Sequence, residues 1–417
     1  MNMKADLFSR WMVWAVTYNA AMEKVNLDAV EALMSPIRNN EYDLIVVGMQ
    51  AVPHFETLGG FASTWQAAVA EWIAVNARTM TLVAKTYQAT NQLTFFMAKK
   101  RLESVEEVAF RYMKSTFGGL TGHKGSIGLK VRMKGLKNST SKGAGFVFVV
   151  SHFFHDATQN HRRLQQFGTN KYCTFPDRSN INARIWLGDL NFRVEKDSEE
   201  VASALRNGDF KDLLESDQLS HGRKHKLVFG TYNESTINFP PTYKLVKGTT
   251  EYDYRRTPSW CDRILFEGTG ITCEKYDSIP QALHSDHLPV YGEFSIMAPS
   301  AGEAQWDVVF ESIPTWLTPV PLVVRFQYLN NFWSKKGAYQ DWIGIYPATI
   351  EDITRPLKWN YAVTCYETTI NEILYSVAEL SAMPAGTYRV GYFSANFHVL
   401  VGLSNSIKIE EVSLENF

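Results

Sequence analysis

Short apolar runs and amphipathic stretches alternate along the first two thirds of the chain. The apolar runs are rich in β-branched residues, are flanked by turn residues and lie at residues 44–49, 145–151, 185–187 and 264–266. Helical periodicity is found between them, at residues 61–76, 161–167 and 207–219. Buried strands and amphipathic helices have these patterns. The alternation predicts an α/β domain with helices packed on both faces of a central sheet.

The last quarter of the chain has little helical periodicity. Strand-like segments separated by turns lie at residues 306–311, 322–327, 342–346, 371–375 and 386–393. Such a series predicts a β-sandwich. The segment 297–305 is small and polar and contains proline and glycine, which is typical of a linker. We therefore expect two independently folding domains, at residues 1–297 and 306–412.

Composition narrows the class of protein. The chain has 417 residues, 45% of them hydrophobic and 20% charged, which is enough for two hydrophobic cores. A formal net charge of -1 argues against binding nucleic acid or anionic membranes through bulk charge. The four cysteines lie far apart, which fits neither a zinc knuckle nor a disulfide framework. With no signal-like or membrane-spanning run, we expect a cytoplasmic protein that meets membranes only at their surface.

The strongest chemical signal is the block WLGDLNFR at residues 186–193. A short apolar strand ends in glycine, and Asp189 and Asn191 follow two residues apart, so both project from the same side of the strand's end. An acid and an amide placed there orient an attacking water and hold a phosphoryl oxygen. Taken alone, such a segment is more often an Asx-rich turn.

Three further segments add to this signal. The block PSWCDRIL at residues 258–265 places Asp262 directly before an apolar strand, and Asp286 and His287 precede another. A carboxylate that binds a histidine fixes its tautomer and raises its basicity. His152 follows a fourth strand. We expect these strand ends to converge on one rim of a sheet, where α/β folds place their sites.

These blocks resemble those of the inositol polyphosphate 5-phosphatases, whose hallmarks are W-x-G-D-L-N-[FY]-R and P-[AS]-W-C-D-R-[IV]-L. The resemblance covers about residues 11–296 and includes the segment PPTYK at 240–244. It implies a four-layered α/β sandwich, shared with apurinic endonucleases and sphingomyelinases. It also implies that the 5-phosphate of a phosphoinositide or a soluble inositol polyphosphate is removed by in-line water attack, with Mg²⁺ as cofactor.

The resemblance implies roles for individual residues. Asp189 orients or deprotonates the attacking water, with Asn191 beside it on the phosphoryl oxygens. His287, paired with Asp262, stabilises the 5-phosphate, and His152 is a further phosphate contact. The groups expected to hold substrate phosphates are Lys124, Tyr243, Lys244 and Arg263. Asp286 is expected on the metal side of the site.

Two positions depart from the family pattern. The family's T-W-N-[VL] and Q-E-[VI] segments are matched to residues 13–16 and 50–52, so Ala15 and Ala51 replace the asparagine and the glutamate that coordinate magnesium. A methyl group cannot replace a carboxylate ligand. Asn19 and Glu56 are near in sequence, but the sequence does not show that either reaches the vacated position. His123 stands where asparagine is frequent, and histidine also donates to phosphate.

Three functions stay open. The first is a magnesium-dependent 5-phosphatase, and the second is a catalytically impaired homologue that binds inositol headgroups or targets membranes. A nuclease or sphingomyelinase on the same fold is the third, and the segments at 240–244 and 258–265 argue against it because they belong to the 5-phosphatase branch.

The second domain carries a weaker resemblance. The segments DWIGIYP at 341–347 and GTYRVGYF at 386–393 resemble the SKICH domain. The resemblance implies an immunoglobulin-like sandwich that targets a membrane or a protein partner. The tryptophans expected to pack in its core are Trp306, Trp316, Trp342 and Trp359.

Overall fold

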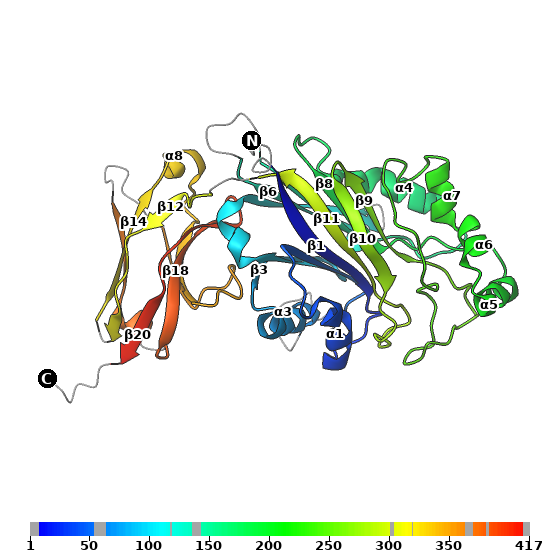
Figure 1. The fold of residues 1–417 in the computed structure, drawn as a ribbon, viewed down its shortest axis with the longest axis horizontal. Coiled ribbons are helices and arrows are strands. Elements are labelled where there is room, and N and C mark those ends of the chain that lie inside the picture. The colour runs from blue at the N-terminus through cyan, green and yellow to red at the C-terminus, as the bar shows by residue number, and fades with distance from the viewer. Residues whose placement is uncertain are drawn as a thin grey trace, which may run out of the picture.

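The computed structural model describes residues 8–53, 64–116, 119–135, 143–300, 304–318, 320–362, 370–380 and 383–411. Two units follow each other along the long axis of the molecule (Figure 1). Glu56 and Cys365 lie outside the described residues. No helix in the described ranges is long and apolar enough to cross a membrane.

The N-terminal domain contains two sheets. One has the strand order β10-β11-β1-β2-β4-β3 and the other β5-β6-β7-β8-β9. The strands of the first sheet are β1 (Phe8–Asn19), β2 (Leu44–Gln50), β3 (Met80–Gln88), β4 (Asn91–Ala98), β10 (Ile271–Ser278) and β11 (Val290–Pro299). Those of the second are β5 (Val105–Thr116), β6 (Thr121–Met133), β7 (Gly145–His152), β8 (Ala183–Asp189) and β9 (Asp262–Gly268). The pairs β1–β2 and β7–β8 are parallel, and the other neighbours are antiparallel.

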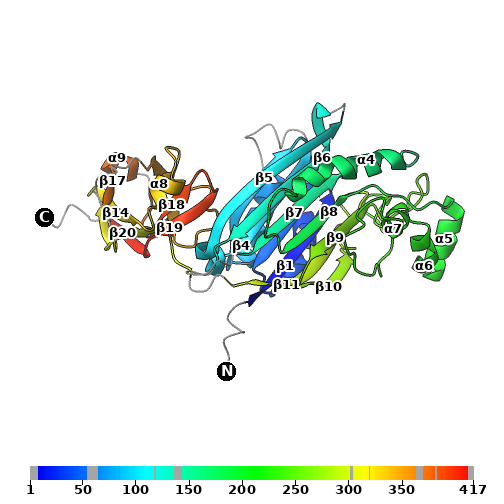
Figure 2. The ribbon, with the colours of Figure 1, turned by 90° about the horizontal axis from the view of Figure 1, so that it is seen from above.

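The two sheets pack face to face, with helices on their outer faces (Figures 1 and 2). The first sheet is covered by α1 (Leu27–Met34) and α3 (Trp65–Asn76). The helices on the side of the second sheet are α4 (Asn160–Asn170), α5 (Ser198–Asn207), α6 (Phe210–Glu215) and α7 (Gln218–Lys224). The four-layered sandwich that the resemblance implied is confirmed. The single central sheet inferred from periodicity alone is wrong, because a strand that is buried on both faces has the same pattern in either architecture.

Strand β2 illustrates how one strand serves two cores. All seven of its residues are buried. Leu44 and Val46 lie in the core between the sheets, whereas Ile45 and Val47 lie in the core beneath α1 and α3. Alternate side chains of a strand point to opposite faces, so a continuous apolar run is required here.

Asp217 explains why the predicted helix at 207–219 is interrupted. Its carboxylate accepts a hydrogen bond from the backbone N–H of Ser220 at 2.9 Å and so begins α7. An aspartate at this position satisfies a backbone donor that would otherwise lack a partner. The segment therefore forms α6 and then starts a second helix.

The C-terminal domain is a β-sandwich, as its strand pattern predicted. A sheet with the order β12-β14-β17 faces one with the order β13-β20-β18-β15-β16, in which β19 also pairs with β18. The strands are β12 (Val308–Phe310), β13 (Trp316–Thr318), β14 (Leu322–Tyr328), β15 (Trp342–Pro347), β16 (Lys358–Tyr361), β17 (Asn371–Tyr375), β18 (Gly386–Ser394), β19 (Val399–Leu403) and β20 (Ile407–Glu411). Two short helices, α8 (Phe332–Lys336) and α9 (Val377–Leu380), complete it. Of the four tryptophans expected in the core, Trp359 is 48% exposed because it lies on the edge strand β16.

The boundary between the domains differs from the expected linker. Strand β11 continues through Pro299, and Met297 pairs with Arg10 of β1. Main-chain hydrogen bonds also join the C-terminal domain to the N-terminal domain. They run from Leu82 N to Glu351 O at 2.8 Å and from Val108 N to Phe397 O at 2.8 Å. It contacts the ends of the sheets from which β1 starts, so the two domains form one elongated body (Figures 1 and 2).

Candidate active site

Four strands bring polar side chains to the opposite end of the sheets. β1 ends at Asn19, β7 at His152 and β8 at Asp189, and the antiparallel strand β9 begins at Asp262. In the sheet register, His152 lies beside Asp189, which in turn lies beside Asp262. The strand ends therefore meet on one rim, and the loop before β11 adds His287.

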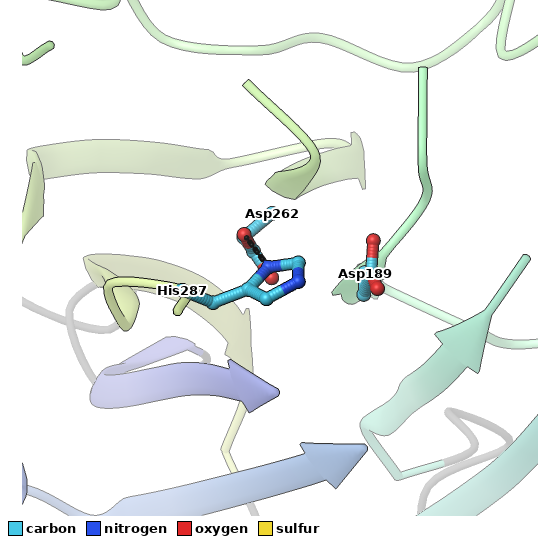
Figure 3. A group of neighbouring side chains, drawn as sticks. All are labelled: Asp189, Asp262 and His287. Atoms are coloured by element: carbon cyan, nitrogen blue, oxygen red, sulfur yellow. Dashed lines mark hydrogen bonds and ion pairs between the residues drawn. The ribbon is translucent and has the colours of Figure 1, made fainter. Parts of the chain in front are cut away.

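His287 and Asp262 form a hydrogen-bonded pair. The imidazole Nδ1 of His287 lies 2.8 Å from Oδ2 of Asp262, and the hydroxyl of Thr242 donates to the same oxygen at 2.7 Å. The ring lies between the carboxylates of Asp262 and Asp189 (Figure 3). Burial disfavours a charged imidazole, but the charge of Asp262 and its hydrogen bond prevail and raise the pKa of His287. His287 therefore lies between two carboxylates, and the protonated form of its ring is favoured over that of a free histidine.

Asp189 is buried and remains ionised. Its Oδ2 accepts a hydrogen bond from Nδ2 of Asn19 at 2.8 Å and lies 3.2 Å from Nε2 of His152. Its Oδ1 accepts from the backbone N–H of Asn191 at 3.1 Å. Burial alone raises the pKa of a carboxyl group, but the hydrogen bond with His152 and the charge of His287 hold the pKa of Asp189 below its ordinary value.

Lys124 adds a cation to the site. Its Nζ contacts Nε2 of His152. Burial lowers the pKa of Lys124 to about 8. Burial, together with the charge of Lys124, lowers the pKa of His152 to about 4. At neutral pH the ammonium group is therefore charged and the imidazole of His152 is neutral.

Asn191 is held by protein groups on both sides of its amide. Its backbone has a φ of 57°, its Nδ2 donates to the carbonyl of Phe153 at 3.1 Å, and its Oδ1 accepts from Arg193 at 2.5 Å. The Arg193 guanidinium lies 4.7 Å from the centre of the Tyr243 ring, which packs 4.4 Å from the His287 ring. Sequence reasoning missed Arg193, although it closes the block at 186–193.

The prediction for Ala15 is wrong. Ala15 lies in the middle of β1, fully buried in the core between the sheets, where it pairs with Val46 and Gly292. Ala15, Thr17 and Asn19 share one face of the strand, and only Asn19 reaches the rim. The segment Thr17-Tyr18-Asn19 fits the family's T-W-N block four residues further along, and this signal identifies Asn19 as the residue that contacts Asp189.

The prediction that Arg263 holds substrate phosphate is also wrong. Arg263 is fully buried, 2.9 Å from the carboxylate of Asp217 and 2.7 Å from that of Glu234. It follows Asp262 in a strand, so its side chain points to the opposite face. Lys244 lies 3.2 Å from Asp253 and is about a quarter exposed, so its place on the substrate stays a prediction, as does that of Tyr243.

Whether the site suits a divalent cation depends on the side-chain oxygens at positions 51, 262 and 286. Ala51 follows β2 with a φ of 48° and offers no side-chain oxygen. Asp286 is half-buried, and its charge helps to raise the pKa of His287. Among the described residues, Oδ1 of Asp262 is buried without a hydrogen-bond partner. Mg²⁺ is commonly held by one or two carboxylates together with substrate phosphates. The donors present therefore fit a hard cation, with fewer protein ligands than the family pattern.

Comparisons with known proteins agree with this geometry. Residues 16–293 match the model of Endonuclease/Exonuclease/phosphatase family 2, and residues 308–409 match that of the SKICH domain. The type IV inositol polyphosphate 5-phosphatase 11 of Arabidopsis thaliana is 30% identical over 306 residues, which cover 70% of this chain and 84% of that protein. The chain belongs to the inositol polyphosphate 5-phosphatase family.

Other relatives extend the comparison. The phosphatidylinositol 3,4,5-trisphosphate 5-phosphatase 1 of Xenopus laevis is 28% identical, and the match covers 61% of this chain but 26% of that protein. A crystal structure of the 5-phosphatase domain of SpSynaptojanin, in complex with inositol (1,4)-bisphosphate and calcium ion, has a TM-score of 0.61 and 24% identity. It covers 71% of this chain and 87% of that one, and it supports the fold.

Proposed function

We propose that this chain hydrolyses the 5-phosphate of inositol polyphosphates, either soluble or carried as phosphoinositide headgroups. The observation that supports this most directly is a buried, ionised Asp189 that faces the His287–Asp262 pair at the rim of the sheets. Relatives in the family are named as inositol polyphosphate and phosphoinositide 5-phosphatases.

The side chains divide the work of an in-line displacement. Asp189 accepts a hydrogen bond from the attacking water and orients it, while Asn19 keeps the carboxylate in place. The protonated ring of His287 donates from Nε2 to a phosphoryl oxygen, and Asp262 accepts from Nδ1 and orients the ring. Lys124 supplies a positive charge at neutral pH. A magnesium ion held by Asp286 and Oδ1 of Asp262 would add charge stabilisation at the phosphoryl oxygens.

A second function is favoured by the side chain at position 51. Ala51 has a methyl group where the family pattern has a carboxylate, so a bound cation depends on fewer protein oxygens. A chain with this site binds inositol phosphates and turns them over slowly. The two functions differ in rate and in magnesium dependence, not in ligand.

Phosphate release distinguishes them. The full chain is assayed with magnesium on inositol 1,4,5-trisphosphate and on vesicles that contain phosphatidylinositol 4,5-bisphosphate, with Asp189→Asn as the negative control. Release that the control lacks supports the phosphatase. Equal release from the parent and the control, with tight binding of inositol 1,4-bisphosphate by the parent, supports the impaired homologue.

The C-terminal domain is proposed as a targeting module for a membrane surface or a protein partner, in the cytoplasm. Exposed apolar side chains on its sheets support this role, among them Trp359, Tyr361 and Leu374. Co-sedimentation of the full chain and of a chain that ends at Ser300 with vesicles tests the membrane alternative.

A further inference from the structure

The hairpin between β3 and β4 lies against the strand that carries Lys124. Its two ends, Gln88 and Asn91, pair with each other and are 5% and 1% exposed. The carbonyl of Thr90 accepts a hydrogen bond from the backbone N–H of Val52 at 3.0 Å, which holds the hairpin to the segment that follows β2. Two buried amide side chains are therefore fixed next to the end of β2.

Both amides bind main-chain carbonyls of neighbouring strands. Nδ2 of Asn91 donates to the carbonyl of Gly122 at 2.8 Å and to that of His123 at 3.2 Å. Nε2 of Gln88 donates to the carbonyl of Met113 on β5 at 3.0 Å. Oδ1 of Asn91 has no donor in the described part of the chain, so its two N–H bonds alone orient the amide. These contacts fix the main chain of residues 122 and 123.

The sheet itself does not hold this segment. On one side, the pairing of β5 with β6 shifts register before Gly125, and on the other side β7 pairs with β6 only from Gly125 onward. Residues 122–124 therefore have no paired residue in the described parts of β5 and β7. An interrupted ladder leaves backbone groups that need other partners. Asn91 binds two of them, and the hydroxyl of Thr116 accepts from the backbone N–H of Lys124 at 2.9 Å.

Glycines on both sides of Lys124 make room for the hairpin. A Cβ at Gly122 would lie 2.3 Å from Cγ of Gln88, and a Cβ at Gly125 would lie 2.5 Å from Nε2 of Gln88. Any side chain at these positions would push the hairpin away, and glycine alone permits so close an approach. The residues around the lysine and the amides of the hairpin are therefore fitted to each other.

The position of the ammonium group depends on this main chain. A lysine side chain has a flexible four-carbon stem, so its own bonds do not fix its Nζ. Nζ of Lys124 contacts Nε2 of His152, which lies 3.2 Å from Oδ2 of Asp189. A misplacement of about 1 Å in a catalytic site costs up to about 10²-fold in activity. The contacts that hold residues 122 and 123 therefore bear on the chemistry.

We infer that Asn91 and Gln88 are positioning residues, which fix the main chain before Lys124 so that its ammonium group stays against His152 and near Asp189. Neither amide touches the substrate, because both are buried and bind main-chain carbonyls. The inference deepens the proposed function and rests on it, because Lys124 belongs to the same site. Asn91 has the larger part, since it binds the two residues that directly precede the lysine.

The test follows the ring of His152 by NMR in the full chain, labelled at histidine Cε1, with His152→Gln to assign its signal. Burial and the charge of Lys124 lower the pKa of His152 to about 4. Asn91→Leu keeps the size of the side chain but has no donor, and we expect it to raise this pKa by about one pH unit, because the ammonium group moves away. Lys124→Met should raise it at least as far. The double variant should not exceed Lys124→Met, since two residues that act through one contact are not additive.

Asn405→Leu is the matched control. Nδ2 of Asn405 also donates to two main-chain carbonyls, those of Ile313 at 2.8 Å and Ser406 at 3.0 Å, but in the C-terminal domain. Its loss should lower the melting temperature and leave the pKa of His152 unchanged. An unchanged pKa of His152 in Asn91→Leu, or a double variant in which the two rises add, overturns the inference. If Asn91→Leu does not fold, Asn91→Ser takes its place under the same criteria.

Phosphate release separates this inference from the proposed function. In a chain that releases phosphate, kcat/KM for inositol 1,4,5-trisphosphate should fall severalfold in Asn91→Leu and in Lys124→Met, without a further fall in the double variant. A chain that releases no phosphate would contradict the proposed function. The titration of His152 needs no turnover, so it would still decide whether Asn91 positions Lys124.

Discussion

Each domain buries an aspartate where one strand begins beside the end of its antiparallel neighbour, yet the two have different surroundings. In the N-terminal domain, Asp262 begins β9 and binds His287, with Asp189 close by. In the C-terminal domain, Asp341 precedes β15 and is also fully buried. It accepts hydrogen bonds from the backbone N–H groups of Ala338 and Ala395 and from the hydroxyl of Tyr392.

The difference is in the donors. Burial raises the pKa of both Asp262 and Asp341, but the described donors to Asp341 are all neutral, so it acts as a structural cap between β15 and β18. The N-terminal carboxylates are surrounded by groups that titrate, and the pKa values of Asp189 and His287 move in opposite directions. Such separation of neighbouring titratable groups is typical of catalytic sites. Burial of an acid alone therefore does not identify a site.

Replacing Asp189 in the N-terminal domain and Asp341 in the C-terminal domain should test this difference with the largest effect. Asp189→Asn keeps the shape of the side chain but removes the proton acceptor, and we expect kcat for phosphate release to fall by about 10²–10⁴-fold. Asp341→Asn should leave kcat within about twofold and lower the stability by about 1–3 kcal/mol, because one buried acceptor is lost. Phosphate release and thermal unfolding of both variants measure this. Comparable losses of kcat in the two variants would remove the distinction.

The sequence predicted the polar blocks well and their partners poorly. Asp189, Asp262 and His287 lie in short contiguous motifs, so their position at strand ends follows from local pattern. Asn19 was noted but not placed at the site, because the segments at 13–16 and 17–19 of one buried strand compete for the same match and only the strand's length decides which one reaches the rim. Arg263 was misplaced because its partners, Asp217 and Glu234, come from loops whose positions depend on tertiary packing.

Ala15 and Ala51, the two positions that depart from the family pattern, can be distinguished by experiment. Ala51→Glu returns a carboxylate directly after the end of β2, and we expect the magnesium concentration for half-maximal phosphate release to fall by about one to two orders of magnitude. Ala15→Asn should give no such gain and should lower the melting temperature, because it places an amide in an apolar core. Titration of phosphate release with magnesium, alongside thermal unfolding, compares them. A gain from Ala15→Asn would restore the original assignment.

The charge of Lys124 predicts a pH dependence. Its pKa of about 8 lies below that of a free lysine, so the ammonium group is present below pH 8 and is lost as the pH rises through this value. We expect KM for inositol 1,4,5-trisphosphate to rise severalfold from about pH 7 to about pH 9. Lys124→Arg keeps its charge over this range and should flatten the profile. An unchanged profile in this variant would assign the titration to another group.

Removing the C-terminal domain should have the smallest effect on the chemistry. It binds at Leu82 and Val108, at the ends of the sheets opposite Asn19 and Asp189, so its loss does not alter the contacts of the catalytic groups. A chain that ends at Ser300 should release phosphate from soluble inositol 1,4,5-trisphosphate with a kcat within about twofold of the full chain, since distant, independent sites are nearly additive. Its melting temperature should fall by a few degrees, because the hydrogen bonds across the interface are lost. Steady-state kinetics and thermal unfolding of both chains test this. A large fall in kcat with an unchanged melting temperature would show that the C-terminal domain controls the site from the far end of the molecule.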